Sequence, residues 1–411
     1  MLQLLLGGSG SGKTTLLYQR IRARAEKGEK SILLVPEQFT SSTEGRIYRE
    51  LGDALSGMVE SFSFTSLAEK ILSTEGGAAV QTLSDAGRAV LVRRALEELQ
   101  DNVHYYHRHR RSAAFCQMAA QTIDELKSAG LSGRQLAQLA GACGAESGKL
   151  SELALIFQGY ETLLARSGMD PSDRLELAGA RLEEALARHS LPEFLRDRAV
   201  FIDEFDTFNA PKKRLLGAML AALPSVTVAL CDDGAPLLPG DLSLFSGAKQ
   251  VAAQLHQLAR KNGAEVAVPQ LLRKDLRHRN APGLAAVAEL LETGSCTADA
   301  PAGEVRLFAA PSREEEARAA AGAIRRLMRQ GVRCGKIAVV CRDIAKYRAA
   351  VRYEFRMAEI PLYCDEPTTP EFSAPATAVR ALLERGVRHV SIGSDQQIIA
   401  AGCKALLEAA Y

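Results

Sequence analysis

The sequence predicts an α/β fold built on a parallel sheet, and three observations support this prediction. Strand and helix signals alternate through residues 2–62. A glycine-rich loop joins the first expected strand, residues 2–6, to the helix that follows it. A second apolar run, residues 199–202, ends in Asp203 and Glu204. Because strands and helices alternate, we expect a doubly wound sheet with helices on both faces.

The strands of this sheet are expected on both sides of a long helical stretch. Each is a short apolar run bounded by glycine or polar residues, as buried parallel strands usually are. They fall at residues 2–6, 31–35, 59–62, 199–202 and 226–231, with helices expected at 14–27 and 43–55. The sheet domain is therefore discontinuous, made of residues 1–75 together with residues 196–291.

Residues 76–195 separate the two halves of the sheet domain. They have helical periodicity and no convincing strand signals. The candidate helices lie at residues 113–129, 133–142, 150–166 and 174–189. We therefore expect an all-helical insertion between the third and fourth strands.

A second α/β unit is expected after residues 292–303, a polar stretch rich in Pro, Gly and Ala that is typical of a linker. Strand and helix signals then resume, with strands expected at residues 305–308 and 337–341 and helices at 313–330 and 345–357. Residues 304–411 thus predict the start of a second domain that is incomplete.

The glycine-rich loop fits the pattern G-x-x-x-x-G-K-[ST], which predicts a phosphate-binding loop (P-loop) for ATP. Glycines let the backbone curl so that several N–H groups point at one anion, and the helix that follows adds its positive end. Lys13 is expected to reach the β- and γ-phosphates, and Thr14 to hold Mg²⁺. The residues expected to contact ATP are Gly7, Gly8, Ser9, Gly10, Ser11, Gly12, Lys13, Thr14 and Thr15. The alternative is a Gly/Ser turn before a lysine, but the flanking strand and helix favour phosphate binding.

The apolar run that ends in Asp203 and Glu204 is typical of the acidic strand that accompanies a P-loop. Asp203 is expected to coordinate Mg²⁺ through water, and Glu204 to polarise the attacking water, so these two residues and Lys13 are the catalytic candidates. The alternative is a strand followed by an exposed acidic turn. The presence of a P-loop pattern in the same chain favours the catalytic interpretation.

Composition limits the class of protein without identifying its partner. The chain has 411 residues, 47% of them hydrophobic, which is enough for two or three domains. Its net charge of +2 does not by itself indicate a nucleic-acid-binding protein. Its eight cysteines contain no C-x-x-C pair, so neither a zinc site nor a disulfide framework is expected. No stretch is long enough to span a bilayer and the first strand begins at Leu2, so we expect a cytoplasmic protein without a membrane partner.

The layout and local sequence resemble superfamily 1 helicases of the UvrD type, and more closely the AddB family, which belongs to the bacterial ATP-dependent helicase/deoxyribonuclease. The similarity to AddB rests on L-V-P-E-Q-F-T at 34–40, S-F-S-x-x-S-L-A-E-K-I-L at 61–72 and D-E-L-K-S-A-G-L-S at 124–132. The segment 305–366 is also similar in order and spacing. The resemblance covers residues 1 to about 385.

The resemblance implies RecA-like motor domains: a 1A-like domain (1–75 and 196–291), a 1B-like insertion (76–195) and an incomplete 2A-like domain (304–411). It implies ATP and Mg²⁺ as ligands, binding to single-stranded DNA or duplex ends, and an AddA-like motor and nuclease subunit as the heterodimer partner. The implied role is repair of double-strand breaks by homologous recombination. Family members are longer, with a nuclease domain and an iron–sulfur cluster, neither of which is expected in this sequence.

The sequence departs from a working helicase of this superfamily at the element that follows the acidic strand. A glutamine couples the γ-phosphate to DNA there, whereas residues 231–237 read C-D-D-G-A-P-L. Residues 277–280 stand in the region of the N-Y-R-S arginine with more than one register open, and Arg279 is the residue that we place there. The resemblance therefore implies a degraded motor that binds DNA while its partner translocates, although Glu204 would allow some hydrolysis.

Aromatic residues near strand ends are the candidate DNA contacts, because ligands gather at the carboxyl edge of a parallel sheet and bases stack on aromatic rings. These candidates are Phe39, Thr40, Phe62 and Phe64. The alternative for each phenylalanine is core packing. The basic segment 104–111 could track phosphates, or form a solvated loop between helices. A second hypothesis for the whole chain is a P-loop ATPase adaptor that binds a protein partner in a nucleotide-dependent way.

Overall fold

The computed structural model describes residues 1–77, 82–142, 144, 147–295 and 304–364. The chain divides into two compact units, Met1–Val305 and Arg306–Tyr411, and each is described by itself.

The first unit contains the predicted parallel sheet. Its six strands are β1 (Leu2–Gly7), β2 (Ser31–Leu34), β3 (Val59–Phe62), β4 (Ala199–Ile202), β5 (Ser225–Cys231) and β6 (Gln270–Leu272). Their order is β3-β2-β4-β5-β1-β6, and every pair is parallel. The α/β class and the five expected strands are confirmed, and β6 is an additional edge strand. Because all strands run the same way, their carboxyl ends meet at one edge of the sheet.

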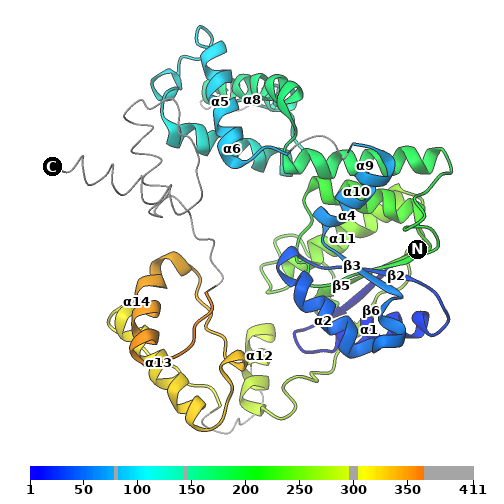
Figure 1. Cartoon of the computed structure of the whole chain (residues 1–411), viewed down its shortest axis with the longest axis vertical. Helices are drawn as coiled ribbons and strands as arrows, with labels where there is room; N and C mark the ends of the chain where they lie inside the picture. The colour runs from blue at the N-terminus through cyan, green and yellow to red at the C-terminus, as the bar shows by residue number, and fades with distance from the viewer. Residues whose placement is uncertain (78–81, 143, 145–146, 296–303, 365–411) are drawn as a thin grey trace, which may run out of the picture. The chain divides into compact units, whose positions relative to one another are not determined.

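Helices cover both faces of the sheet, as Figure 1 shows. One face packs against α1 (Lys13–Ala25), η1 (Glu37–Phe39), α2 (Thr40–Leu51) and α3 (Asp53–Ser56). The other packs against α4 (Phe64–Glu75), α10 (Ala210–Ala222) and α11 (Ser246–Lys261). Neighbouring strand residues point to opposite faces, so Leu4 belongs to the second core and Leu5 to the first. Burial of both faces explains why the strands are continuous apolar runs.

Helices fill the described chain between β3 and β4. After α4 come α5 (Asp85–Glu98), η2 (His107–His109), α6 (Ala113–Ser128), α7 (Gly133–Ala140), α8 (Ser147–Ser167) and α9 (Pro171–Ala187). The helices expected at 113–129, 133–142, 150–166 and 174–189 correspond to α6–α9. Leu91–Leu164 contribute a separate apolar core that includes Phe157 and Tyr160, both fully buried. Helix α9 packs on α4 and α10, which attaches this helical segment to the sheet.

A helix and a second unit follow β6. Helix α12 (Pro282–Thr293) belongs to the first unit, whereas α13 (Arg313–Arg329), η4 (Cys334–Lys336) and α14 (Ile344–Met357) belong to the second. Helices α13 and α14 pack through Ala317, Ile324 and Phe355.

The strands expected at residues 305–308 and 337–341 are not formed in the described part of the second unit. An apolar run becomes a strand only when a neighbouring strand offers hydrogen-bonding partners. Leu307 and Val340 are almost fully exposed, at 101% and 91%. This part of the prediction is therefore wrong for the described residues, and the remainder of the expected domain, 365–411, lies outside them.

Candidate functional site

The glycine-rich loop, residues 7–14, leaves the carboxyl end of β1 and enters α1 through two left-handed backbone positions. Gly10 has φ 79° and Gly12 has φ 91°, a region that residues with a Cβ rarely adopt. Gly12 is the N-cap of α1 and offers no side chain to its first N–H groups. These donors, together with the positive end of the helix, remain available to an anion.

Lys13 folds back across the loop that precedes it. Its Nζ donates hydrogen bonds to the carbonyl oxygens of Gly7 and Gly8, both at 2.8 Å. Burial lowers the pKa of Lys13, although the nearby carboxylate of Asp203 acts in the opposite direction. The ammonium group is therefore partly desolvated and held at the centre of the loop.

The acidic strand end meets the start of α1. Asp203 follows β4, its backbone N–H donates to the carbonyl of Leu34 at 3.1 Å, and only 6% of the residue is exposed. Burial raises the pKa of its carboxyl group, and a hydrogen bond from the Thr14 side chain opposes that rise. The structure thus brings together the two residues that the sequence predicted to share a metal ion.

Glu204 stands beside Asp203 in an unusual backbone conformation. Its φ of 65° is left-handed, and its N–H donates to Asp203 Oδ1 at 3.0 Å. Burial and the neighbouring Asp203 charge raise the pKa of Glu204. Such an outlier at a strand end directs the glutamate side chain away from the sheet, toward the pocket described next.

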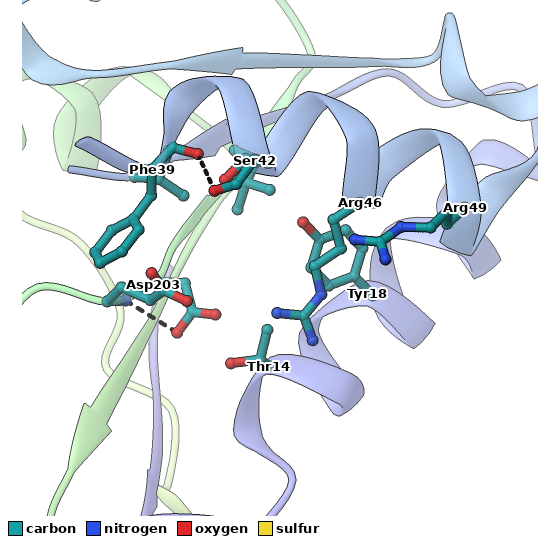
Figure 2. A pocket seen from close by; sticks show the side chains of 11 residues that line it. Thr14, Tyr18, Phe39, Ser42, Arg46, Arg49 and Asp203 are labelled. Carbon is teal, nitrogen blue, oxygen red and sulfur yellow. Dashed lines mark hydrogen bonds between the residues drawn. The ribbon is translucent and has the colours of Figure 1, made fainter. Parts of the chain in front are cut away.

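A pocket of about 210 Å³ opens beside these residues, as shown in Figure 2. It is bounded by α1, the ends of β2 and β4, and the η1–α2 segment, and its lining residues are Thr14, Tyr18, Leu33, Val35, Phe39, Ser42, Thr43, Arg46, Arg49, Asp203 and Glu204. The sequence pattern did not indicate Tyr18, Arg46 or Arg49 as site residues. The only local signal for the arginines is their spacing of three residues on one helix, which places them on the same face.

The segment after β6 lies against the glycine-rich loop. The N–H of Leu276 donates to the Gly10 carbonyl at 3.0 Å, and Arg277 Nη1 donates to Ser9 Oγ at 3.3 Å. A Cβ added at Gly10 would lie 2.7 Å from the Arg277 Cβ, so only glycine fits there without movement. Arg279, which the resemblance placed at this position, is exposed. The structure therefore places Arg277, rather than Arg279, against the loop.

The strand between β1 and β4 ends in Cys231, where the expected glutamine is missing. The next residue, Asp232, is 2% exposed, and its N–H donates to the Gly7 carbonyl at 3.2 Å. Its Oδ1 accepts the N–H of Gly234 at 2.7 Å, which closes a local turn. Burial raises the pKa of Asp232. This side chain is engaged by its own turn.

The candidate DNA contacts differ in their surroundings. Phe64 is 2% exposed and packs edge-on against Phe205 and Phe208, at centroid distances of 5.2 and 6.0 Å. Phe62 is half-buried beside Phe194. Phe39 is half-buried and lines the pocket, and the neighbouring Thr40 hydroxyl donates to the Glu37 carbonyl at 2.9 Å. Burial therefore leaves Phe64 without an exposed face for a base.

The basic segment 104–111 lies on the helical region between β3 and β4. The Glu152 carboxylate accepts backbone N–H groups of His104, Tyr105 and Tyr106 at 2.7–3.1 Å. The Tyr105 ring is 55% exposed, with Lys149 Nζ 5.3 Å from its centroid. A carboxylate thus fixes the start of this segment, while most of its cations face solvent.

The chemistry of the site suits a hard cation and an anion together. The Thr14 hydroxyl and the Asp203 carboxylate are oxygen donors of the kind that Mg²⁺ prefers. In the described residues, no cluster of three or more His, Cys, Asp or Glu side chains could hold a metal without other ligands. A magnesium ion here would therefore need oxygens from a phosphate or water. No helix in the described part of the chain is long and apolar enough to cross a bilayer.

The fold and the site define an α/β protein whose parallel sheet carries a glycine-rich loop and an acidic strand end at one edge. A family model described as "ADDB, N-terminal" matches residues 4–288, which is more than half of the chain. The chain therefore belongs to the AddB family.

Individual relatives agree with this assignment. The B subunit of an ATP-dependent helicase/deoxyribonuclease from Desulforudis audaxviator is 33% identical over 397 residues, covering 93% of this chain and 33% of that protein. Proteins of the same name from Symbiobacterium thermophilum and Moorella thermoacetica are each 32% identical, covering 95% and 93% of this chain and 34% of their own length. The chain thus spans about a third of the length of these relatives.

Proposed function

We propose that this chain is the ATP- and DNA-binding N-terminal part of an AddB-like protein. The proposed protein acts on broken DNA ends during homologous recombination, beside an AddA-like motor and nuclease partner. The observation that carries the ATP-binding proposal is the pairing of Thr14 with Asp203 at the mouth of the glycine-rich loop. The names of the relatives, which describe one subunit of an ATP-dependent helicase/deoxyribonuclease, support the DNA and partner proposals.

The residues of the loop would bind the phosphates of ATP. Backbone N–H groups at the start of α1 point at the anion, and Lys13 would exchange the carbonyls of Gly7 and Gly8 for phosphate oxygens. Thr14 and Asp203 would hold Mg²⁺, which when bound offsets charge on the phosphates. Arg277, held against Ser9, supports the same site from the opposite side of the loop.

Hydrolysis by this chain would be slow. Glu204 can orient and polarise a water molecule, and its carboxyl group serves as a base only when ionised. The position that carries glutamine in related motors ends here in Asp232, which is closed into its own turn. We therefore propose a degraded motor in which nucleotide binding is retained and turnover is weak.

The test is nucleotide and DNA binding by the purified chain and its Lys13→Ala variant. We expect the parent to bind Mg-ATP and single-stranded DNA, with DNA affinity falling as salt rises. Lys13→Ala should lose at least tenfold in ATP affinity and retain DNA binding. A folded parent without ATP affinity would overturn the proposal. ATP-dependent binding of a protein partner without DNA affinity would favour the adaptor hypothesis instead.

A further inference from the structure

We propose that Arg46 on α2 contacts the terminal phosphate of the bound nucleotide, so that the pocket distinguishes a triphosphate from a diphosphate. This inference rests on the proposed ATP-binding function and extends it to a residue outside the glycine-rich loop and the acidic strand end.

The position of Arg46 is fixed by its neighbours on two helices. Thr43 and Ile47 on the same helix are buried at 6% and 5% exposure, which anchors this face of α2 on the sheet. The Arg46 guanidinium lies 5.0 Å from the centroid of the Tyr18 ring, and Tyr18 is itself 5% exposed on α1. Tyr18 follows Thr14 by four residues, so both side chains share one face of α1. Figure 2 shows the guanidinium of Arg46 directed at the space beside Thr14.

The contact with Tyr18 holds the cation without consuming its hydrogen bonds. A guanidinium over an aromatic face is attracted by the ring quadrupole, and its N–H donors remain in the plane of the group. Within the described part of the chain, Arg46 forms no ion pair at 4.0 Å or less. Its charge nevertheless lowers the pKa of both Asp203 and Glu204, against the larger effect of their burial. Arg46 is thus a preoriented cation that faces the acidic pair with its donors available.

The location of the pocket decides which phosphate Arg46 would meet. The pocket begins at Thr14, Asp203 and Glu204, where the metal and the last phosphate of a bound triphosphate would lie. A planar guanidinium forms two parallel hydrogen bonds to phosphate oxygens, which an ammonium group cannot reproduce. A diphosphate held by the same loop ends one group earlier and offers Arg46 no such oxygens. Arg46 should therefore contribute to ATP affinity much more than to ADP affinity.

The test measures dissociation constants for a non-hydrolysable ATP analogue and for ADP, with Mg²⁺, by titration calorimetry. We expect Arg46→Ala to weaken binding of the ATP analogue at least tenfold and binding of ADP less than twofold. Arg46→Lys should recover only part of the loss, because it restores charge without the planar fork. Arg46→Gln keeps much of the side-chain stem over Tyr18, so it provides a second variant if Arg46→Ala does not fold.

Arg22→Ala is the matched control. Arg22 is an exposed arginine of α1 that donates to the Glu50 carbonyl on α2. Its substitution therefore removes the same charge and also loosens the α1–α2 pair, but Arg22 does not line the pocket. We expect both dissociation constants to stay within twofold of the parent. Equal losses of ATP and ADP affinity in the Arg46 variants, or no loss, would overturn the role of Arg46. A parent that binds neither nucleotide would instead overturn the proposed function from which this inference starts.

Discussion

The Thr14 side chain hydrogen-bonds to the Asp203 carboxylate, joining the first turn of α1 to the carboxyl end of β4. The strand order makes this contact possible, because β5 lies between β1 and β4 and all three strands end at one edge. Two short sequence motifs from opposite sides of the helical segment α4–α9 therefore meet. The contact also explains the strained surroundings of Glu204, whose N–H is held by the same carboxylate.

Asp203→Asn should bind Mg-nucleotide at least tenfold more weakly, because the substitution removes the charged oxygen donor. It should also stabilise the folded chain at neutral pH. Burial raises the folded-state pKa of Asp203, so the ionised form destabilises the fold above that pKa. One unit of such a shift corresponds to about 1.4 kcal/mol.

The pH dependence gives this prediction its sign. The stability advantage of Asp203→Asn should be present at pH 7 and shrink as the pH falls from the raised pKa toward the ordinary range, where the parent carboxyl group is protonated. Urea unfolding at pH 7 and pH 4 would measure it. Asp206→Asn is the control, since Asp206 is exposed three residues further on. A stability difference that grows on acidification would contradict the prediction.

Gly10→Ala should destabilise the chain more than Gly28→Ala. The two glycines have nearly the same backbone angle, φ 79° and 77°, so both substitutions carry a left-handed strain of about 1 kcal/mol. The added methyl group at Gly10 would lie 2.7 Å from the Arg277 Cβ, whereas nothing lies within 4 Å at Gly28.

The difference between these variants isolates the close approach of the 275–277 segment to the loop. Thermal unfolding should show a lower Tm for Gly10→Ala, and only this variant should lose nucleotide affinity. Equal Tm values with unchanged ATP binding in both variants would show that residues 275–277 do not pack tightly on the loop.

Much of the sheet could be predicted because its information is local. Each of β1–β5 is an apolar run long enough to register as a buried strand, and the glycine pattern marks where β1 ends. Strand β6, Gln270–Leu272, has three half-buried residues and depends on pairing with β1, so its sequence alone carries little signal. The converse error arose at 305–308 and 337–341, where apolar runs have no strand beside them in the described residues.

The candidate site divides in the same way. The glycine-rich loop and Asp203 were predicted because their chemistry is written in consecutive residues. Arg46 and Arg277 were not, because each reaches the site from a separate element by tertiary packing. Phe64 follows a strand just as Phe39 follows one, and only the packing of Phe205 and Phe208 distinguishes the two environments.

Asp170→Ala should cost about 3 kcal/mol of stability, since removing one member of a buried charge network leaves its partners unsatisfied. Asp170 is 1% exposed, accepts the Tyr160 hydroxyl at 2.6 Å and pairs with Lys127 at 2.8 Å. Asp85→Ala is the matched control, because its carboxylate pairs with Arg88 but is 95% exposed, and such pairs contribute about 0–1 kcal/mol. Urea unfolding would compare them. Similar costs for the two variants would show that the Asp170 network is not buried in solution.

Glu204→Gln should bind ATP with the affinity of the parent and lose at least tenfold in turnover, because the amide cannot accept a proton from water. In the parent, turnover should rise with pH through the pKa of Glu204, which burial and Asp203 raise above its ordinary value. The measurement is phosphate release under saturating Mg-ATP at several pH values. A variant with unchanged turnover, or a parent rate that falls as the pH rises from 4 to 7, would exclude Glu204 as the base.

Phe39→Ala and Phe64→Ala should have opposite effects on DNA affinity and stability. Phe39 is half-buried at the pocket, so its loss should weaken binding of single-stranded oligonucleotides by roughly five- to tenfold, within the 1–3 kcal/mol range of base stacking. Its loss should cost the fold little. Phe64 is enclosed by Phe205 and Phe208, so its truncation should cost about 3–5 kcal/mol. Fluorescence anisotropy of a labelled oligonucleotide, beside urea unfolding, separates these effects. Weaker DNA binding by folded Phe64→Ala with Phe39→Ala unaffected would reverse the assignment and place the stacking surface on the other face of the sheet.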